Sequence, residues 1–146
     1  MDQRELVKKF HLFTGVTSKD LQALEAIVER KGYKAGDLVY NEGDVADALF
    51  LIEMGTVDIL PKGKETVFAT IGSGQGFGEA AFFEGGKRPA SAYTRERTYL
   101  LRIPFEQLSN MLAERPELAL LVYRNACRFF AKHFRTIALD LDRRYL

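Results

Sequence analysis

The chain has 146 residues, of which 47% are hydrophobic and 28% are charged. This size and composition predict one globular domain over residues 1–146 with a core of its own. A formal net charge of +1 excludes an overall basic field that would attract nucleic acid or a membrane surface.

The sequence carries no signal for export or membrane insertion. No apolar run approaches the ~18–20 residues of a membrane span. The charged start, Met1 to Glu5, lacks the apolar run of a secretory signal. Cys127 is the only cysteine, so a disulfide within the chain is impossible. We therefore expect a cytoplasmic protein with no membrane partner.

Residues 1–30 are predicted to be helical. The apolar residues from Leu6 to Phe13 recur at helical spacing, which predicts a short helix that Gly15 ends. Thr17 or Ser18 is a candidate cap for a second helix. That helix would run on until Gly32 closes it.

Residues 31–103 change to short β-prone pieces separated by Gly and Asp. Several short strands at near-regular spacing are typical of a sandwich or barrel. The run from Leu49 to Glu53 is almost continuously apolar, which suits a strand buried on both faces. We expect strands at about 37–41, 48–54, 56–61, 65–71, 90–95 and 98–103.

Residues 104–146 return to the helical period. Pro104 suits a first helical position, and Pro116 separates this helix from a long last one. Residues 117–141 would span roughly 37 Å at about 1.5 Å per residue. The apolar stripe of this helix is too wide for one neighbour. Two explanations stay open: it packs on the same helix of a second copy, or it folds back entirely on its own barrel. The residues of the stripe are Leu118, Leu121, Val122, Ala126, Phe129, Phe130, Phe134, Ile137, Ala138 and Leu141.

The stretch 77–94 combines features of an anion site. Gly78 permits close approach of the backbone to a ligand. Glu79 to Phe83 is long enough for about one helical turn, whose free N–H groups attract an anion. Arg88 adds a planar cation that can grip two phosphate oxygens, and Glu79 can accept hydrogen bonds from hydroxyls. A phosphate, a sugar hydroxyl and an apolar shell describe a small nucleotide.

The order Phe77-Gly78-Glu79, then Arg88, then Ala90-Ser91-Ala92 resembles the phosphate-binding cassette of the cyclic nucleotide-binding domain family. The resemblance extends to Phe10–Val16, to the turns at Gly36-Asp37, Asn41–Asp44 and Glu53–Gly55, and to Ile71–Gly74. It implies that Arg88 pairs with the cyclic phosphate and that Glu79 binds the ribose 2′-hydroxyl. Other positions that it places at the nucleotide are Gly78, Ala80, Ala81, Ala90 and Ser91, with Ile59 and Phe68 near the base.

The sequence departs from the family pattern in three places. Pro89 follows Arg88, where the family often has Ser, Thr or Ala. Proline has neither a backbone N–H nor a hydroxyl. In the family a hydroxyl at this position is associated with accepting cGMP, so the resemblance implies cAMP as the ligand. Gln75 replaces an Asp and is expected to alter only a turn. His133 and Phe134 stand where a dimeric bacterial sensor of the family contacts the adenine, and Phe134 could stack on the base.

Enzymatic chemistry finds little support. His11 and His133, the two histidines, lack metal-ligand companions, which argues against a metal-dependent jelly roll of the cupin kind. No nucleophile with an adjacent base and no Walker-type loop is present. We expect a protein that is not an enzyme and holds neither metal nor cofactor.

We therefore predict an α+β domain in which an antiparallel jelly-roll barrel lies between N-terminal helices and a C-terminal helical pair. Its expected function is to bind a cyclic nucleotide, cAMP rather than cGMP, and to move its last helices. We expect a homodimer through the last helix and no direct DNA binding, because few residues follow Leu141. The alternative is a family member that no longer binds nucleotide and serves as a dimerisation module.

Overall fold

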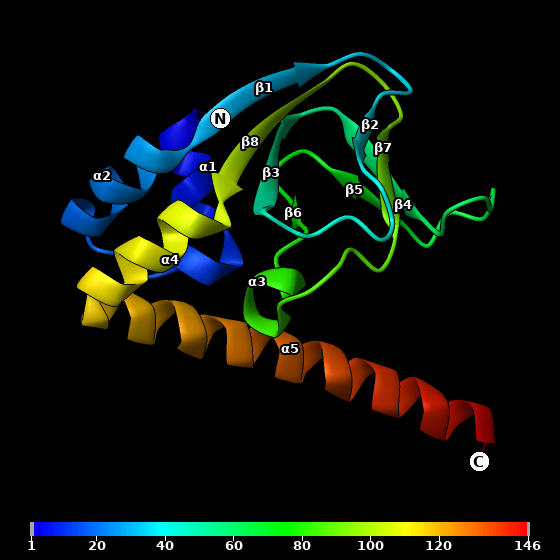
Figure 1. Cartoon of the computed structure of the whole chain (residues 1–146). Helices are drawn as coiled ribbons and strands as arrows, with labels where there is room; N and C mark the ends of the chain where they lie inside the picture. Colours follow the sequence, from blue (N-terminus) through cyan, green and yellow to red (C-terminus); the bar gives the residue numbers. More distant parts are fainter. Residues whose placement is uncertain (1, 146) are drawn as a thin grey trace.

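A computed structural model describes residues 2–145, with side chains to residue 141. Within that range, the strands form two four-stranded antiparallel sheets with the orders β1-β8-β3-β6 and β2-β7-β4-β5 (Figure 1). This is the strand order of a jelly roll. The predicted antiparallel jelly roll with flanking helices is therefore confirmed. One detail differs, because the sheets face each other without closing into a continuous barrel.

The N-terminal segment forms three short helices. They are α1 (Gln3–Lys9), the 3-10 turn η1 (His11–Phe13) and α2 (Ser18–Ile27). The single helix predicted over Leu6–Phe13 is broken, because Phe10 adopts an extended ψ of 137° between α1 and η1. Thr17 caps α2 by accepting a hydrogen bond from the Asp20 amide, as predicted from its hydroxyl.

Most strands lie close to their predicted ranges. They are β1 (Glu29–Tyr33), β2 (Leu38–Tyr40), β3 (Ala48–Met54), β4 (Thr56–Leu60), β5 (Ala69–Gly72), β6 (Gly76–Phe77), β7 (Ser91–Thr94) and β8 (Thr98–Pro104). Two strands were not predicted, β1 and β6. The predicted strand at 65–71 starts only at Ala69, since the residues before it belong to the exposed turn after β4.

Gly32 explains why the prediction missed β1. The sequence interpretation took Gly32 as the end of the second helix, but it pairs with Tyr99 within the β1–β8 ladder. A Cβ atom at Gly32 would come within 3.1 Å of the Tyr99 ring. The missing side chain therefore makes room for a cross-strand aromatic ring, which is a tertiary requirement.

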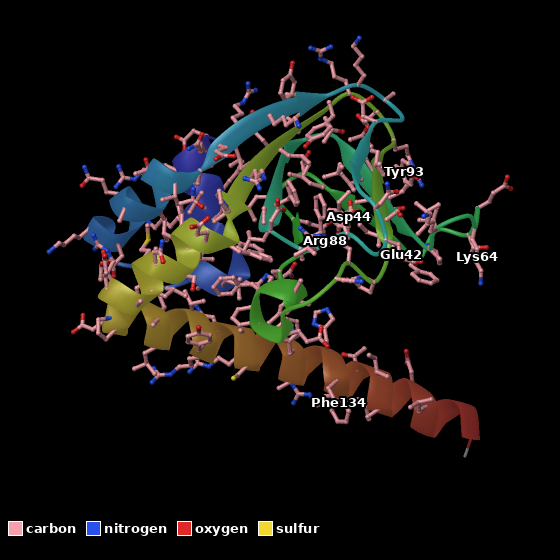
Figure 2. The ribbon with its side chains drawn as sticks, in the orientation of Figure 1. Glu42, Asp44, Lys64, Arg88, Tyr93 and Phe134 are labelled. Atoms are coloured by element: carbon pink, nitrogen blue, oxygen red, sulfur yellow. The ribbon has the colours of Figure 1, made fainter. Side chains whose placement is uncertain are left out.

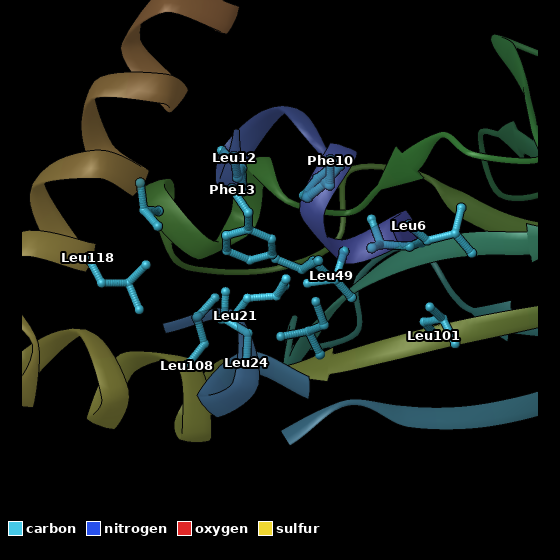
Figure 3. Close-up of a cluster of buried hydrophobic side chains, with 14 of the residues drawn as sticks. Leu6, Phe10, Leu12, Phe13, Leu21, Leu24, Leu49, Leu101, Leu108 and Leu118 are labelled. Atoms are coloured by element: carbon cyan, nitrogen blue, oxygen red, sulfur yellow. The ribbon is translucent and has the colours of Figure 1, made fainter. Parts of the chain in front are cut away.

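Strand β3 separates two hydrophobic cores. Leu49 and Leu51 point to the helices, where they pack with residues of α1, η1, α2, α4, α5 and β8 (Figure 3). Phe50 and Ile52 point between the two sheets and pack with Phe77 of β6. The prediction of a strand buried on both faces is confirmed, since all residues from Ala48 to Ile52 are buried.

Helices α4 (Phe105–Glu114) and α5 (Pro116–Tyr145) complete the fold. The first turns of α5 pack on η1 and α4, and its later turns extend beyond the other helices (Figure 1). Every side chain from Ala131 to Leu141 is exposed. The explanation in which the helix folds back entirely on its own barrel is therefore wrong. None of the helices in the described range has both the length and the apolar character that crossing a membrane requires.

Candidate functional site

The candidate site is built by the segment that connects β6 to β7. From Phe77 the chain passes through Gly78 and Glu79 into the short helix α3 (Ala80–Glu84) and then returns through Gly85-Gly86 to Arg88. Figure 1 shows α3 between the sheets and α5. The predicted helical turn after Glu79 is therefore present, and it lies where a ligand could touch both the sheets and the helices.

Arg88 is a buried cation without an acidic partner. Its side chain is directed into the fold from the β7 end of the segment (Figure 2), and the residue is only 3% exposed. Nη1 donates to the Gly78 carbonyl at 3.1 Å and Nη2 to the Ala48 carbonyl at 2.6 Å. No acidic side chain within residues 2–141 forms an ion pair with it.

The surroundings of Arg88 are apolar and aromatic. The guanidinium carbon lies 4.1 Å from the centroid of the Tyr40 ring. The ring centroids of Phe50 and Phe105 are farther from this carbon, at 6.0 and 5.9 Å. Burial lowers the pKa of Arg88 from its usual value. An unpaired buried charge is costly, and an anionic ligand would supply the missing partner.

Gly78 is required for this arrangement. It adopts a φ of +80°, which residues with a side chain rarely do. A Cβ atom there would come within 2.8 Å of Arg88 Nη1. Gly78 therefore provides both the turn out of β6 and the space in which the guanidinium lies.

The backbone of Arg88 is held by the turn after β2. The Arg88 amide donates to the Asp44 carbonyl at 2.8 Å, and the Gly43 amide donates back to the Arg88 carbonyl at 2.9 Å. An isolated bridge between Val45 and Lys87 continues this pairing. The Asn41–Asp44 turn thus fixes the position from which the arginine side chain enters the fold.

Glu79 lies on the same cavity as Arg88. The cavity measures about 200 Å³, and burial raises the pKa of the Glu79 carboxyl above its usual value. Its Oε1 lies 3.6 Å from Nε2 of His11. The residues that line the cavity are Tyr40, Ile59, Phe77, Gly78, Glu79, Ala80, Ala81, Arg88 and Pro89.

Six of the predicted site residues therefore meet at one cavity, and four do not. Ala90 is buried beside the cavity without lining it. Ser91 is buried as well, and its hydroxyl accepts a hydrogen bond from the Glu42 amide at 2.8 Å. Phe68 is 68% exposed on the turn before β5. Phe134 is 73% exposed and lies on the side of α5 that faces away from the sheets (Figure 2).

Sequence reasoning missed Tyr40 and Phe77 as wall residues of the cavity. The only local signal for Tyr40 was an aromatic residue directly before the Asn41–Asp44 turn. Helix α5 contributes a separate hollow of about 330 Å³ lined by Phe129, Lys132, His133, Thr136 and Ile137. His133 is near enough to Glu79 that its charge lowers the pKa of that carboxyl, although burial outweighs this.

Helix α3 also connects the cavity to both C-terminal helices. The Phe82 ring lies edge-on to Phe105 of α4 at 5.2 Å. Phe83 contacts Tyr123 and Phe130 of α5 at 5.8 and 6.0 Å between ring centroids. Helix α3 is therefore in direct contact with both α4 and α5.

Comparison with known proteins gives a consistent result. A family profile described as "Cyclic nucleotide-binding domain" matches residues 30–115, which is more than half of the chain. The N-terminal domain of a transcriptional regulator from Streptomyces coelicolor has a similar structure, with a TM-score of 0.79 at 26% sequence identity. That match covers 90% of this chain and 94% of the other.

Two curated relatives have longer chains. The chain is 30% identical over 134 residues to the cyclic AMP receptor protein of Thermus thermophilus, a match that covers 90% of this chain and 60% of the relative. It is 29% identical over 118 residues to a CRP-like cAMP-activated global transcriptional regulator of Mycobacterium tuberculosis, covering 79% and 53% respectively. The chain thus spans little more than half the length of these relatives.

Proposed function

Because the chain belongs to the cyclic nucleotide-binding domain family, we propose that the cavity beside Arg88 is its ligand site and that the ligand is cAMP. The observation that carries the proposal is the buried guanidinium of Arg88, which has no acidic partner among the described side chains. Its fork has more N–H donors than the Gly78 and Ala48 carbonyls use. A cyclic phosphate matches this cation in charge and geometry.

Glu79 gives the ligand its second polar contact. Its carboxylate borders the same cavity and accepts hydrogen bonds only, so it suits the ribose hydroxyl and not the phosphate. Ile59, Ala80, Ala81 and Phe77 provide the apolar wall around these two charges. The cavity therefore has one place for an anion and one for a hydroxyl.

The preference for cAMP over cGMP rests on Pro89 and on the relatives. Pro89 lines the cavity and offers neither an amide N–H nor a hydroxyl to the ligand. Ser91, the nearest hydroxyl in the segment, is engaged by the Glu42 amide. Both relatives described above are named for cyclic AMP.

Thermal unfolding and calorimetry with cAMP and cGMP test this proposal. A ligand at 100 times its dissociation constant stabilises the folded chain by about 2.7 kcal/mol, which is a shift of several degrees for a domain of this size. We expect a larger shift with cAMP. Arg88→Ala should weaken binding about 10- to 150-fold. Arg124 is an exposed arginine on α5, so Arg124→Ala serves as the control and should leave the affinity unchanged.

The result that contradicts the proposal is equally clear. If neither nucleotide shifts the melting temperature, the chain is the predicted alternative, a dimerisation module that has lost its ligand. If both bind and Arg88→Ala leaves the affinity unchanged while its unliganded melting temperature stays normal, Arg88 is not the phosphate partner.

We further propose that ligand binding is passed to the C-terminal helices through α3. Phosphate capture would draw the Gly78–Arg88 segment inward, and Phe82 and Phe83 would move with it. Their ring contacts with Phe105, Tyr123 and Phe130 support this route. Each preference of about 1.4 kcal/mol for one state shifts the balance about tenfold. Hydrogen exchange along α5 with and without cAMP measures this coupling. In Phe83→Ala, cAMP should still bind but should no longer change the exchange in α5.

Helix α5 also supports the proposal of a homodimer. Most of the large exposed apolar residues of α5 recur with alternating steps of three and four positions, as in a coiled-coil seam, and Leu139 lies off this pattern. The residues of the seam are Leu120, Tyr123, Phe130, Phe134, Ile137 and Leu141, with exposed Cys127 at the same spacing. A parallel pair of α5 helices would bring the two copies of Cys127 together, so mild oxidation should give a covalent dimer that Cys127→Ser abolishes.

A further inference from the structure

His11 is the one side chain of η1 that touches both the candidate site and α5. Its Nε2 lies 3.6 Å from Glu79 Oε1. Its ring stacks on Phe129 of α5, with centroids 3.7 Å apart and an angle of only 10° between the rings. The imidazole therefore fills the space between the ligand-facing carboxylate and the long helix.

The Nε2 atom of His11 is buried and has no hydrogen-bond partner within the described residues. Buried polar atoms are nearly always paired, because an unpaired one loses its bonds to water without replacement. The carboxylate of Glu79 is the adjacent acceptor and lies just beyond hydrogen-bond distance. A small rotation of either side chain would bring Nε2–H onto the carboxylate.

The two oxygens of Glu79 allow two different partners at once. A carboxylate accepts several hydrogen bonds, so one oxygen can take the ligand hydroxyl while the other takes Nε2–H. On this basis, which rests on the proposed function, we propose that His11 is a positioning residue. It holds the Glu79 carboxylate in the orientation that receives the ribose hydroxyl, and its stacking on Phe129 makes that orientation depend on α5.

The charged and titratable groups around this contact set its pH dependence. Burial and the charge of His133 lower the pKa of His11 to about 4, so its ring is neutral near neutral pH and donates through one N–H. Burial raises the pKa of Glu79, and His133 counters it in part. The other titratable wall residues of the cavity are Tyr40 and the cation Arg88, and Tyr40 stays protonated because burial raises its pKa. The donor on His11 favours the ionised form of Glu79, so removing it raises the pKa of Glu79 further.

The test compares His11→Phe with His11→Gln. Phenylalanine keeps a ring to stack on Phe129 but has no donor, whereas the amide of glutamine can place an N–H near the Nε2 position. We expect His11→Phe to weaken cAMP binding about 3- to 10-fold and to move the acid fall-off in affinity to higher pH. His11→Gln should restore both. Calorimetry between pH 5 and 8, alongside unliganded melting of each variant, measures these effects.

A double-mutant cycle separates positioning from packing. In a Glu79→Ala background, His11→Phe should cause no further loss of affinity, because the side chain that it positions is gone. If His11→Phe binds cAMP with the wild-type affinity and pH profile, or weakens binding equally in both backgrounds, the inference is wrong and the proposed function stands. If the wild-type chain binds no cAMP, the proposed function fails, and the inference falls with it.

Discussion

Both halves of α5 carry large apolar side chains, but the two halves have different surroundings. Up to Phe129, the helix buries Leu118, Val122 and Ala126 against η1 and its neighbours. Beyond Phe130, every described side chain is exposed, including Phe134 and Ile137. An apolar pattern therefore indicates that a helix face is suited to burial. The size of the rest of the domain decides how much of that face is buried within the same chain.

The largest expected effect is in the packed half. Leu118→Ala should lower the free energy of unfolding by about 2–5 kcal/mol, because Leu118 is fully enclosed and its removal leaves a cavity. Leu139→Ala is the matched control in the exposed half, since Leu139 is 52% exposed and lies outside the proposed seam. Denaturant unfolding measures both. Equal losses would contradict the distinction between a packed and an uncovered face.

A smaller effect is expected at Asn125. Its Nδ2 donates to the Leu12 and Thr14 carbonyls, each at 2.9 Å, and thereby ties α5 to η1. Asn125→Ala should cost about 1–3 kcal/mol of unfolding free energy, because the two carbonyls lose their donor. Asn110→Ala on the exposed face of α4 serves as the control. A loss no larger than that of the control would mean that water replaces the amide.

His11 lies at the boundary between the packed and the exposed half of α5, because it stacks on Phe129 where the packed half ends. Burial lowers its folded-state pKa to about 4, below the ordinary value of about 6.5. Between these pH values the unfolded chain binds more protons, so this group makes stability fall as the pH falls. Glu79 acts in the opposite sense, because burial raises its pKa. His11→Phe should therefore flatten the acid loss of melting temperature, and an unchanged slope would show that His11 is not buried in its neutral form.

The smallest effect on folding is expected in the exposed half. Phe134→Ala should change the unfolding free energy of the monomer by less than about 0.5 kcal/mol. If α5 pairs with a second copy, the same substitution should weaken association markedly, whereas Arg135→Ala should not. Sedimentation at several protein concentrations distinguishes the two variants. Identical association for the wild type and Phe134→Ala would leave the seam without a role in dimer formation.

Part of the candidate site could be predicted because its signals are local. The glycine at position 78, the helical turn after Glu79 and the returning Arg88 are contiguous in sequence, and the fold brings them to one cavity. Phe68 and Phe134 lie away from it, because aromatic character does not reveal which way a side chain points. The Ser91 hydroxyl accepts a hydrogen bond from the Glu42 amide instead. The two residues are 49 positions apart, so no local sequence pattern could have predicted this contact.

The sequence by itself determined the elements whose patterns are read along the chain. These include the doubly buried β3, the cap at Thr17, the glycine-rich turns and the start of the last helix at Pro116. Tertiary structure alone decided what depends on neighbours distant in sequence. Gly32 lies in β1 because of the Tyr99 ring, Tyr40 stacks on Arg88, and His11 lies between Glu79 and Phe129. The spacing of apolar residues along the chain predicts which face of a helix or strand is buried. Which residues contact each other across the fold depends on the path of the whole chain.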